Sequence, residues 1–138
     1  MTISEELLAA YNATDFHVFA GSPFVINIGK FSMQLESLHN AAGVSSSAII
    51  TAYNPYSEQR GSDFNERAQM KMCESIKQLG YKWIDGEGKD PTGNWPGERC
   101  VLVLGCQLAE IKTLGETFEQ NAIVWADSKA VPTLEVLR

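Results

Sequence analysis

Residues 47–53 read Ser-Ala-Ile-Ile-Thr-Ala-Tyr, and this stretch decides the fold. It is almost entirely apolar, which is typical of a strand that is covered on both faces in the middle of a sheet. Asn54 and Pro55 follow it directly. Because proline cannot donate to a strand ladder and pushes the preceding residue towards extended geometry, we expect the strand to end there.

The segments on either side alternate between strands and helices. Upstream, the pattern predicts a helix over residues 3–11 with a capping box of Thr2 and Glu5, a hairpin of strands at 16–19 and 24–28, and a helix that Gly43 ends. Downstream, it predicts a helix over 63–79 with a buried stripe of Phe64, Ala68, Met72, Ile76 and Leu79, a strand at 81–84, a polar loop over 85–97, a strand at 99–104, a helix near 108–118, and a hairpin of strands at 121–125 and 131–137.

The two hairpins indicate the fold class. The connections at Gly21 and Asp127 are too short for the crossover that parallel strands need. We therefore expect an α+β fold with a mainly antiparallel or mixed β-sheet and three to four helices packed mostly on one side. A doubly wound parallel sheet is the weaker alternative. The chain of 138 residues, 1–138, fits a single domain without repeats or linkers.

Composition narrows the classes of function. The chain has 11 Lys plus Arg against 17 Asp plus Glu, a net charge of -6. Because binding phosphates needs clustered basic residues, a nucleic-acid partner is disfavoured. No apolar run reaches the roughly 18 residues of a membrane-spanning helix, and the N-terminus is acidic where a signal peptide would be basic. We therefore expect a cytoplasmic protein without membrane contact, and its oligomeric state stays open.

Cysteine and histidine give no sign of a disulfide framework or a metal site. The three cysteines, Cys73, Cys100 and Cys106, are an odd set. A strand between Cys100 and Cys106 would hold them about 20 Å apart, well beyond disulfide range. Neither His17 nor His39 lies at ligand spacing from a cysteine, so we expect no metal and no cofactor. Cys106 is more simply an inert thiol than a nucleophile, and His39 is expected at the surface near a helix end.

Three segments carry polar residues that the fold does not require. They are Asn54 and Ser57 after the central strand, Trp95 and Glu98 in and after the polar loop, and Gln120 and Asn121 between a helix and a strand. Turn and cap chemistry is one explanation, with Asn121 ending a helix at positive φ. If the central strand is antiparallel to those beginning near residues 99 and 121, however, its exit lies beside their starts. The sequence then predicts one cluster at this edge of the sheet.

The same segments resemble a known family. Residues 51–57 (Thr-Ala-Tyr-Asn-Pro-Tyr-Ser), Asn65, residues 90–98 (Asp-Pro-Thr-Gly-Asn-Trp-Pro-Gly-Glu), 101–105 (Val-Leu-Val-Leu-Gly) and 118–125 (Phe-Glu-Gln-Asn-Ala-Ile-Val-Trp) are similar to an uncharacterised bacterial family designated domain of unknown function 3293, over roughly residues 48–137. The resemblance implies a small soluble domain of bacterial or phage origin, adds Asn65 to the cluster, and brings no established activity. Two departures are Arg99-Cys100 after the glutamate and Glu119 where glycine often precedes the glutamine.

We expect a non-enzymatic binding protein that recognises a small polar ligand or a partner protein through this cluster, with an acidic inhibitor or immunity-type protein as a narrower version. The alternative is a small enzyme acting on a nucleotide-like or amide substrate, with Glu98 as general acid-base and the amides of Asn54 and Gln120 orienting the substrate. A deep pocket around a buried Glu98 of raised pKa favours the enzyme, whereas a flat acidic face favours the inhibitor.

Overall fold

Residues 47–50 form strand β3 (Ser47–Ile50), and all four of its residues are buried. A computed structural model describes residues 3–138. The other elements are α1 (Glu5–Ala13), β1 (Asp15–Val18), β2 (Phe24–Ile26), α2 (Met33–Ala42), the short 3₁₀-helix η1 (Pro55–Ser57), α3 (Ser62–Gln78), β4 (Lys82–Lys89), β5 (Glu98–Leu104), α4 (Leu108–Thr117), β6 (Ala122–Ala126) and β7 (Thr133–Val136). The strands form one seven-stranded sheet in the order β2-β1-β4-β5-β3-β6-β7, and every neighbouring pair is antiparallel.

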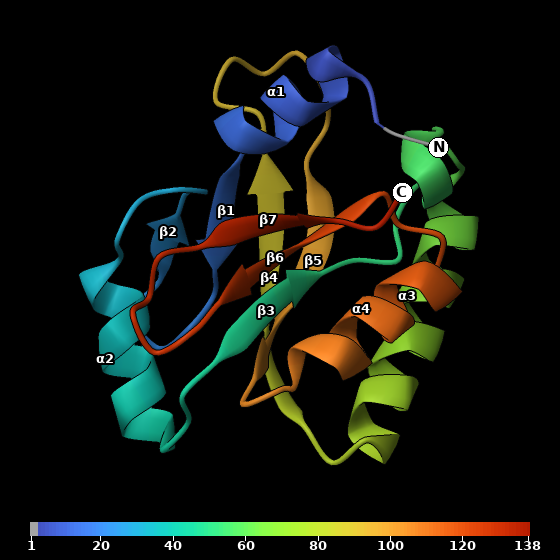
Figure 1. The fold of residues 1–138 in the computed structure, drawn as a ribbon. Coiled ribbons are helices and arrows are strands. Elements are labelled where there is room, and N and C mark those ends of the chain that lie inside the picture. Colours follow the sequence, from blue (N-terminus) through green and yellow to red (C-terminus); the bar gives the residue numbers. More distant parts are fainter. Residues whose placement is uncertain (1–2) are drawn as a thin grey trace.

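The sheet is curled and has a hydrophobic core on each face (Figure 1). α3 and α4 pack on one face, where Met72 and Ile111 meet Ile50 of β3. α2 packs on the other face through Leu35, which meets Ile49. α1 carries no buried residue and lies across the end of the sheet. The predicted α+β class with an antiparallel sheet is confirmed, and the parallel alternative was wrong.

Most of the predicted elements occur close to their expected positions. Both hairpins are present, since β1 pairs with β2 and β6 pairs with β7. Gly43 ends α2 in the left-handed conformation, at φ 69°. The cap of α1 differs: Ser4 Oγ accepts from the Leu7 N–H at 3.1 Å, whereas Thr2 lies outside the described residues. No helix within residues 3–138 has the length and apolar character needed to cross a membrane.

The polar segment 85–97 is not one loop, which corrects the prediction. β4 continues to Lys89 and pairs with both β1 and β5, so only residues 90–97 connect strands. Glycine usually indicates a turn, but here it allows strands to approach closely. A Cβ atom at Gly86 would clash with the carbonyl oxygen of His17. Gly86 and Gly88 are therefore strand residues, whereas Gly93, at φ 75°, lies in the connection that follows.

The buried face of α3 is more polar than the predicted stripe. Phe64 and Leu79 are 44% and 42% exposed, so their expected burial was wrong. Asn65 and Gln69 are buried instead. The Gln69 Oε1 accepts from the Ala52 N–H at 2.9 Å, just beyond the end of β3. The Ala52 N–H thus bonds a side chain of α3 and not the backbone of a neighbouring strand. This explains why β3 ends at residue 50 and not at residue 53.

His39 is buried, and the expectation of a surface position was wrong. Its side chain is 3% exposed, and its Nε2 lies 2.7 Å from Ser47 Oγ. Its Nδ1 has no hydrogen-bond partner among residues 3–138. Burial lowers the pKa of His39, and the charge of Asp127 opposes this shift. The folded protein therefore favours the neutral imidazole.

This buried imidazole makes stability depend on pH. We expect the free energy of unfolding to fall as the pH drops below about 6.5, where the unfolded chain takes up a proton that the folded chain resists, by at most about 1.4 kcal/mol per pH unit. In His39→Gln, which retains a polar partner for Ser47 but does not titrate, the fall should be smaller. Urea unfolding at several pH values around 6.5 measures the free energy of unfolding of both proteins. If it falls equally with pH in both, His39 is not the group responsible.

The close approach of β1 and β4 gives a second stability prediction. We expect Gly86→Ala to lower the free energy of unfolding by about 2 kcal/mol, because the new methyl group overlaps the His17 carbonyl. Gly88→Ala is the matched control, since its Cβ would lie 3.5 Å from its nearest neighbours, in ordinary contact. Urea denaturation of both variants compares them, and equal losses would show that the contact with His17 is not the cause.

Candidate functional site

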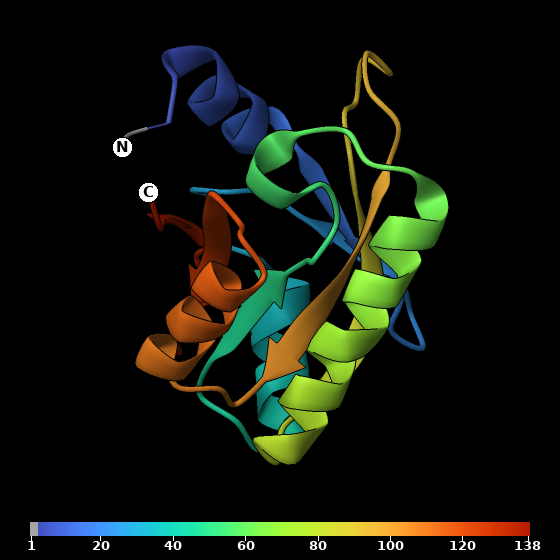
Figure 2. The same cartoon turned by 90° about the vertical axis from the view of Figure 1, so that its right-hand side faces the viewer.

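The exit of β3 lies beside the starts of β5 and β6, because β3 is antiparallel to both. The strand arrangement that predicted a cluster is thus confirmed. Figure 2 shows α1 at the same end of the sheet. A cavity of about 210 Å³ opens there, and five of the predicted residues line it: Asn54, Ser57, Trp95, Glu98 and Gln120. Asn65 and Asn121 do not line it.

Asn54 connects the loop after β3 to the cavity. Its backbone N–H donates to Asn65 Oδ1, and its Oδ1 accepts from Asn65 Nδ2, both at 2.9 Å. Its own Nδ2 donates to Glu98 Oε2 at 2.8 Å. The backbone of Asn54 is left-handed, with φ 47°, a conformation that asparagine tolerates better than most residues. Asn65 therefore holds Asn54 in the orientation that presents its amide to Glu98.

Gln120 and Asn121 hold the same loop from the other side. Gln120 Nε2 donates to the Tyr53 carbonyl at 3.1 Å, and Asn121 Nδ2 donates to Ser57 Oγ at 2.9 Å. The positive φ that helix-cap chemistry predicts at Asn121 occurs instead at Glu119, with φ 57°. This is the position where the sequence departs from the glycine of the family pattern. Both amides thus help to fix the backbone around the cavity.

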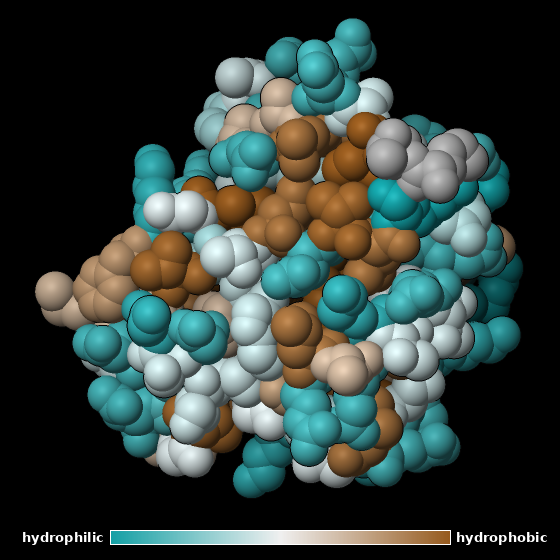
Figure 3. All heavy atoms as spheres, viewed as in Figure 1, coloured by the Kyte–Doolittle hydropathy of each residue, from teal (hydrophilic) through white to brown (hydrophobic). Residues whose placement is uncertain are grey.

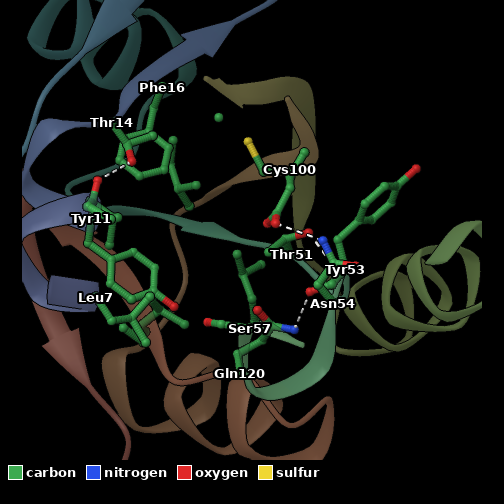
Figure 4. Close-up of a pocket in the computed structure, with 18 of the residues that line it drawn as sticks. Leu7, Tyr11, Thr14, Phe16, Thr51, Tyr53, Asn54, Ser57, Cys100 and Gln120 are labelled. Atoms are coloured by element: carbon green, nitrogen blue, oxygen red, sulfur yellow. Dashed lines mark hydrogen bonds between the residues drawn. The ribbon is translucent and has the colours of Figure 1, made fainter. Parts of the chain in front are cut away.

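Sequence reasoning missed the wall that α1 supplies. Leu7, Ala10 and Tyr11 of α1 line the cavity together with Thr14, which caps this helix. Leu7, Tyr11 and Thr14 lie opposite Asn54 in the close-up view (Figure 4). The hydroxyl of Tyr11 faces Ser57, and burial raises the pKa of Tyr11. The spacing i, i+3, i+4 and i+7 of these residues was the available signal, because side chains at this spacing lie along one face of a helix.

Among the described residues that line the cavity, Glu98 is the only one with an ionisable carboxyl group. Burial raises its pKa, and the hydrogen bond from Asn54 partly opposes the shift. Within residues 3–138 Glu98 has no ion-pair partner, because Arg99 pairs with Glu66 at 2.8 Å and Lys89 with Glu87 at 3.3 Å. An acceptor with raised pKa and no counter-ion is unusual in a structural role and common in binding and catalytic sites.

The cysteines and the metal-binding side chains add no chemistry to this cavity. Burial raises the pKa of Cys100, which lines the cavity, to about 12, and it raises that of Cys106 to about 12 as well. Both thiols are therefore protonated at neutral pH and poor nucleophiles. Cys73 is also free. Across residues 3–138 no three His, Cys, Asp or Glu side chains gather in a way that could hold a metal ion.

The raised pKa of Glu98 predicts a pH-dependent cost to stability. When the pKa of an acid is higher in the folded protein than in the unfolded chain, the folded protein holds the proton more tightly. Its contribution to the free energy of unfolding is therefore fully present at a pH below the pKa of the unfolded chain. This contribution is lost as the pH rises through the pKa of the folded protein. Glu98→Gln keeps the shape and still accepts from Asn54 but cannot ionise. We expect it to raise the free energy of unfolding by about 1 kcal/mol at pH 8, with little effect at pH 4.

Chemical denaturation at the two pH values measures this difference. Glu116→Gln on α4 is the matched control, because Glu116 is exposed and should change stability little at either pH. A Glu98→Gln variant that is less stable than the parent protein at pH 8 would show that the ionised carboxylate is stabilising, against the prediction.

Comparison with known proteins identifies a family. A family model described as "Protein of unknown function (DUF3293)" matches residues 50–123. This range extends from the end of β3 to β6 and contains Asn54, Glu98 and Gln120. No curated protein and no solved structure matches the chain significantly. Because the match covers more than half of its length, the chain belongs to the DUF3293 family of proteins of unknown function.

Proposed function

We propose that this chain is a binding protein that takes a small molecule into the cavity between α1 and the end of the sheet. The observation that carries the proposal is a largely apolar cavity with one carboxylate, Glu98, which Asn54 orients at 2.8 Å. Such an arrangement matches ligand sites in general, in which apolar walls supply contact and a few placed polar groups supply specificity.

The walls indicate the kind of molecule that fits. Leu7 on α1, Phe16 on β1 and Leu134 on β7 are among the apolar residues of the lining. Figure 3 shows apolar surface between α1 and β7. Leu8 on α1 and Val136 on β7 are both exposed. A volume of about 210 Å³ suits a small ligand and not a macromolecular segment. We infer a ligand with an apolar body and a polar group that donates a hydrogen bond to Glu98.

A small enzyme is the second candidate, and the raised pKa of Glu98 favours it. The amides that such an enzyme would use are already engaged, however. Asn54 Nδ2 donates to Glu98, and Gln120 Nε2 donates to the carbonyls of Tyr53 and Phe118. Both N–H groups of the Gln120 amide are therefore used, and Asn54 keeps one free N–H, so at most one amide donor remains to stabilise a developing negative charge. Binding without turnover is therefore the better supported function.

Other versions of the function have less support. A nucleotide-like substrate would need basic groups near its phosphates, and no Lys or Arg lines the cavity. An inhibitor that covers a basic site on another protein would need a flat acidic face, whereas the site at the strand ends is hollow. We propose that binding takes place in the cytoplasm of a bacterial or phage-infected cell, a compartment in which three free cysteines are usual.

A thermal-shift screen with common metabolites and small fragments tests the proposal. Ala10→Phe should block the cavity, because Ala10 lines it from α1, a helix with no buried residue whose change leaves the core intact. We expect ligands that raise the melting temperature of the unmodified protein by a few degrees, about the effect of 1 kcal/mol, to leave Ala10→Phe unchanged.

Ala9→Phe is the matched control, since Ala9 is the neighbouring exposed residue and does not line the cavity. It should respond to ligands as the unmodified protein does. Ligands that stabilise Ala10→Phe equally well bind elsewhere and would refute the cavity as the site. Slow conversion of a bound ligand, followed by NMR, would favour the enzyme instead.

A further inference from the structure

We infer that the ligand of this cavity is an organic cation, an amine or other protonated nitrogen on an aliphatic or aromatic body. The inference rests on the proposed function and adds the charge class of the ligand. It follows from the charges of the lining, from the unfilled hydrogen-bonding capacity of Glu98, and from the aromatic rings around it.

Among the described residues that line the cavity, the only side chain that carries a charge is a carboxylate. The lining contains the carboxyl group of Glu98 and no Lys, Arg or His. In a partly enclosed apolar space a negative charge is weakly screened, so a second anion would be repelled and a cation attracted. The protein as a whole carries a net charge of -6, which favours the approach of cations over that of anions.

Glu98 is half-buried and lacks the counter-ion that a carboxylate shielded from water normally has. Its Oε2 accepts from Asn54 Nδ2, while no side chain or backbone group of residues 3–138 donates to its Oε1. Arg99 follows it directly but pairs with Glu66 on α3, at the opposite face of the sheet. Ionising a half-buried carboxylate without a counter-charge costs free energy, because part of its hydration is lost. A protonated amine supplies both the missing donor and the missing charge.

Aromatic rings complete the environment that cations prefer. Tyr11 on α1, Phe16 on β1 and Trp95 in the 90–97 connection all line the cavity with Glu98. The faces of such rings attract ammonium and guanidinium groups, most strongly where water is excluded. A carboxylate and several aromatic rings without a competing cation are therefore a site for an organic ammonium ion.

Three probes of similar shape and different charge test the inference: 2-phenylethylamine, 2-phenylethanol and phenylacetate. NMR titration of the unmodified protein measures the dissociation constant of each. We expect the amine to bind at least about tenfold more tightly than the alcohol, the difference typical of a charge-assisted hydrogen bond, and phenylacetate to bind most weakly. In Glu98→Gln the amine and the alcohol should bind within about twofold of each other, since the charge is gone.

The outcomes separate this inference from the proposed function. If the alcohol or phenylacetate binds the unmodified protein as tightly as the amine and Ala10→Phe prevents it, the cavity binds ligands but the charge assignment is wrong. If all three probes fail while the metabolite screen finds neutral or anionic ligands, the assignment is equally overturned. If no compound of either set binds, the proposed function itself is wrong. The comparison of the three probes on the unmodified protein stands even if Glu98→Gln does not fold.

Discussion

The paired hydrogen bonds between Asn54 and Asn65 are the constraint on which the site depends. They hold a non-glycine residue in the left-handed conformation at the point where the central strand leaves the sheet. The connection between α4 and β6 holds both sides of this point, because Gln120 donates to the Tyr53 carbonyl and Asn121 donates to Ser57 in η1. The result is a rigid rim of amides, and Glu98 is held against it by a single contact. Core packing alone would leave this end of the sheet open.

The outline of the fold could be predicted because its signals are local. An apolar run ended by Asn54 and Pro55 marks β3, and the short connections mark the hairpins. Antiparallel geometry then brings Asn54, Glu98 and Gln120 to one edge without further information. The length of β4 could not be predicted in the same way. Gly86 is required by the approach of the His17 backbone, a contact between segments far apart in sequence.

The sequence indicated where the polar residues cluster, but it did not indicate which hydrogen bonds each of them makes. Whether an amide faces a ligand or its own backbone depends on the dihedral angles at Asn54 and Glu119, which composition does not reveal. Asn65 and Asn121 therefore support the loop, although they carry the same chemistry as Asn54. The burial of His39 depends likewise on the position of Ser47 across the core. The stripe on α1 was visible in the sequence, but nothing there identified the surface that it would cover.

Two parts of the chain form the cavity, and they contribute differently to the hydrophobic core. The segment that matches the family, residues 50–123, provides the carboxylate of Glu98 on β5 and the amide of Asn54 in the loop after β3. The side chains of both strands also form the core. The opposing wall on α1 lies outside that match, in a helix without a buried residue. Substitutions in α1 can therefore reshape the cavity at little cost to folding, while Glu98 and Asn54 keep their positions. Such an architecture permits diversification, because one wall of the cavity can vary around a carboxylate whose position is fixed.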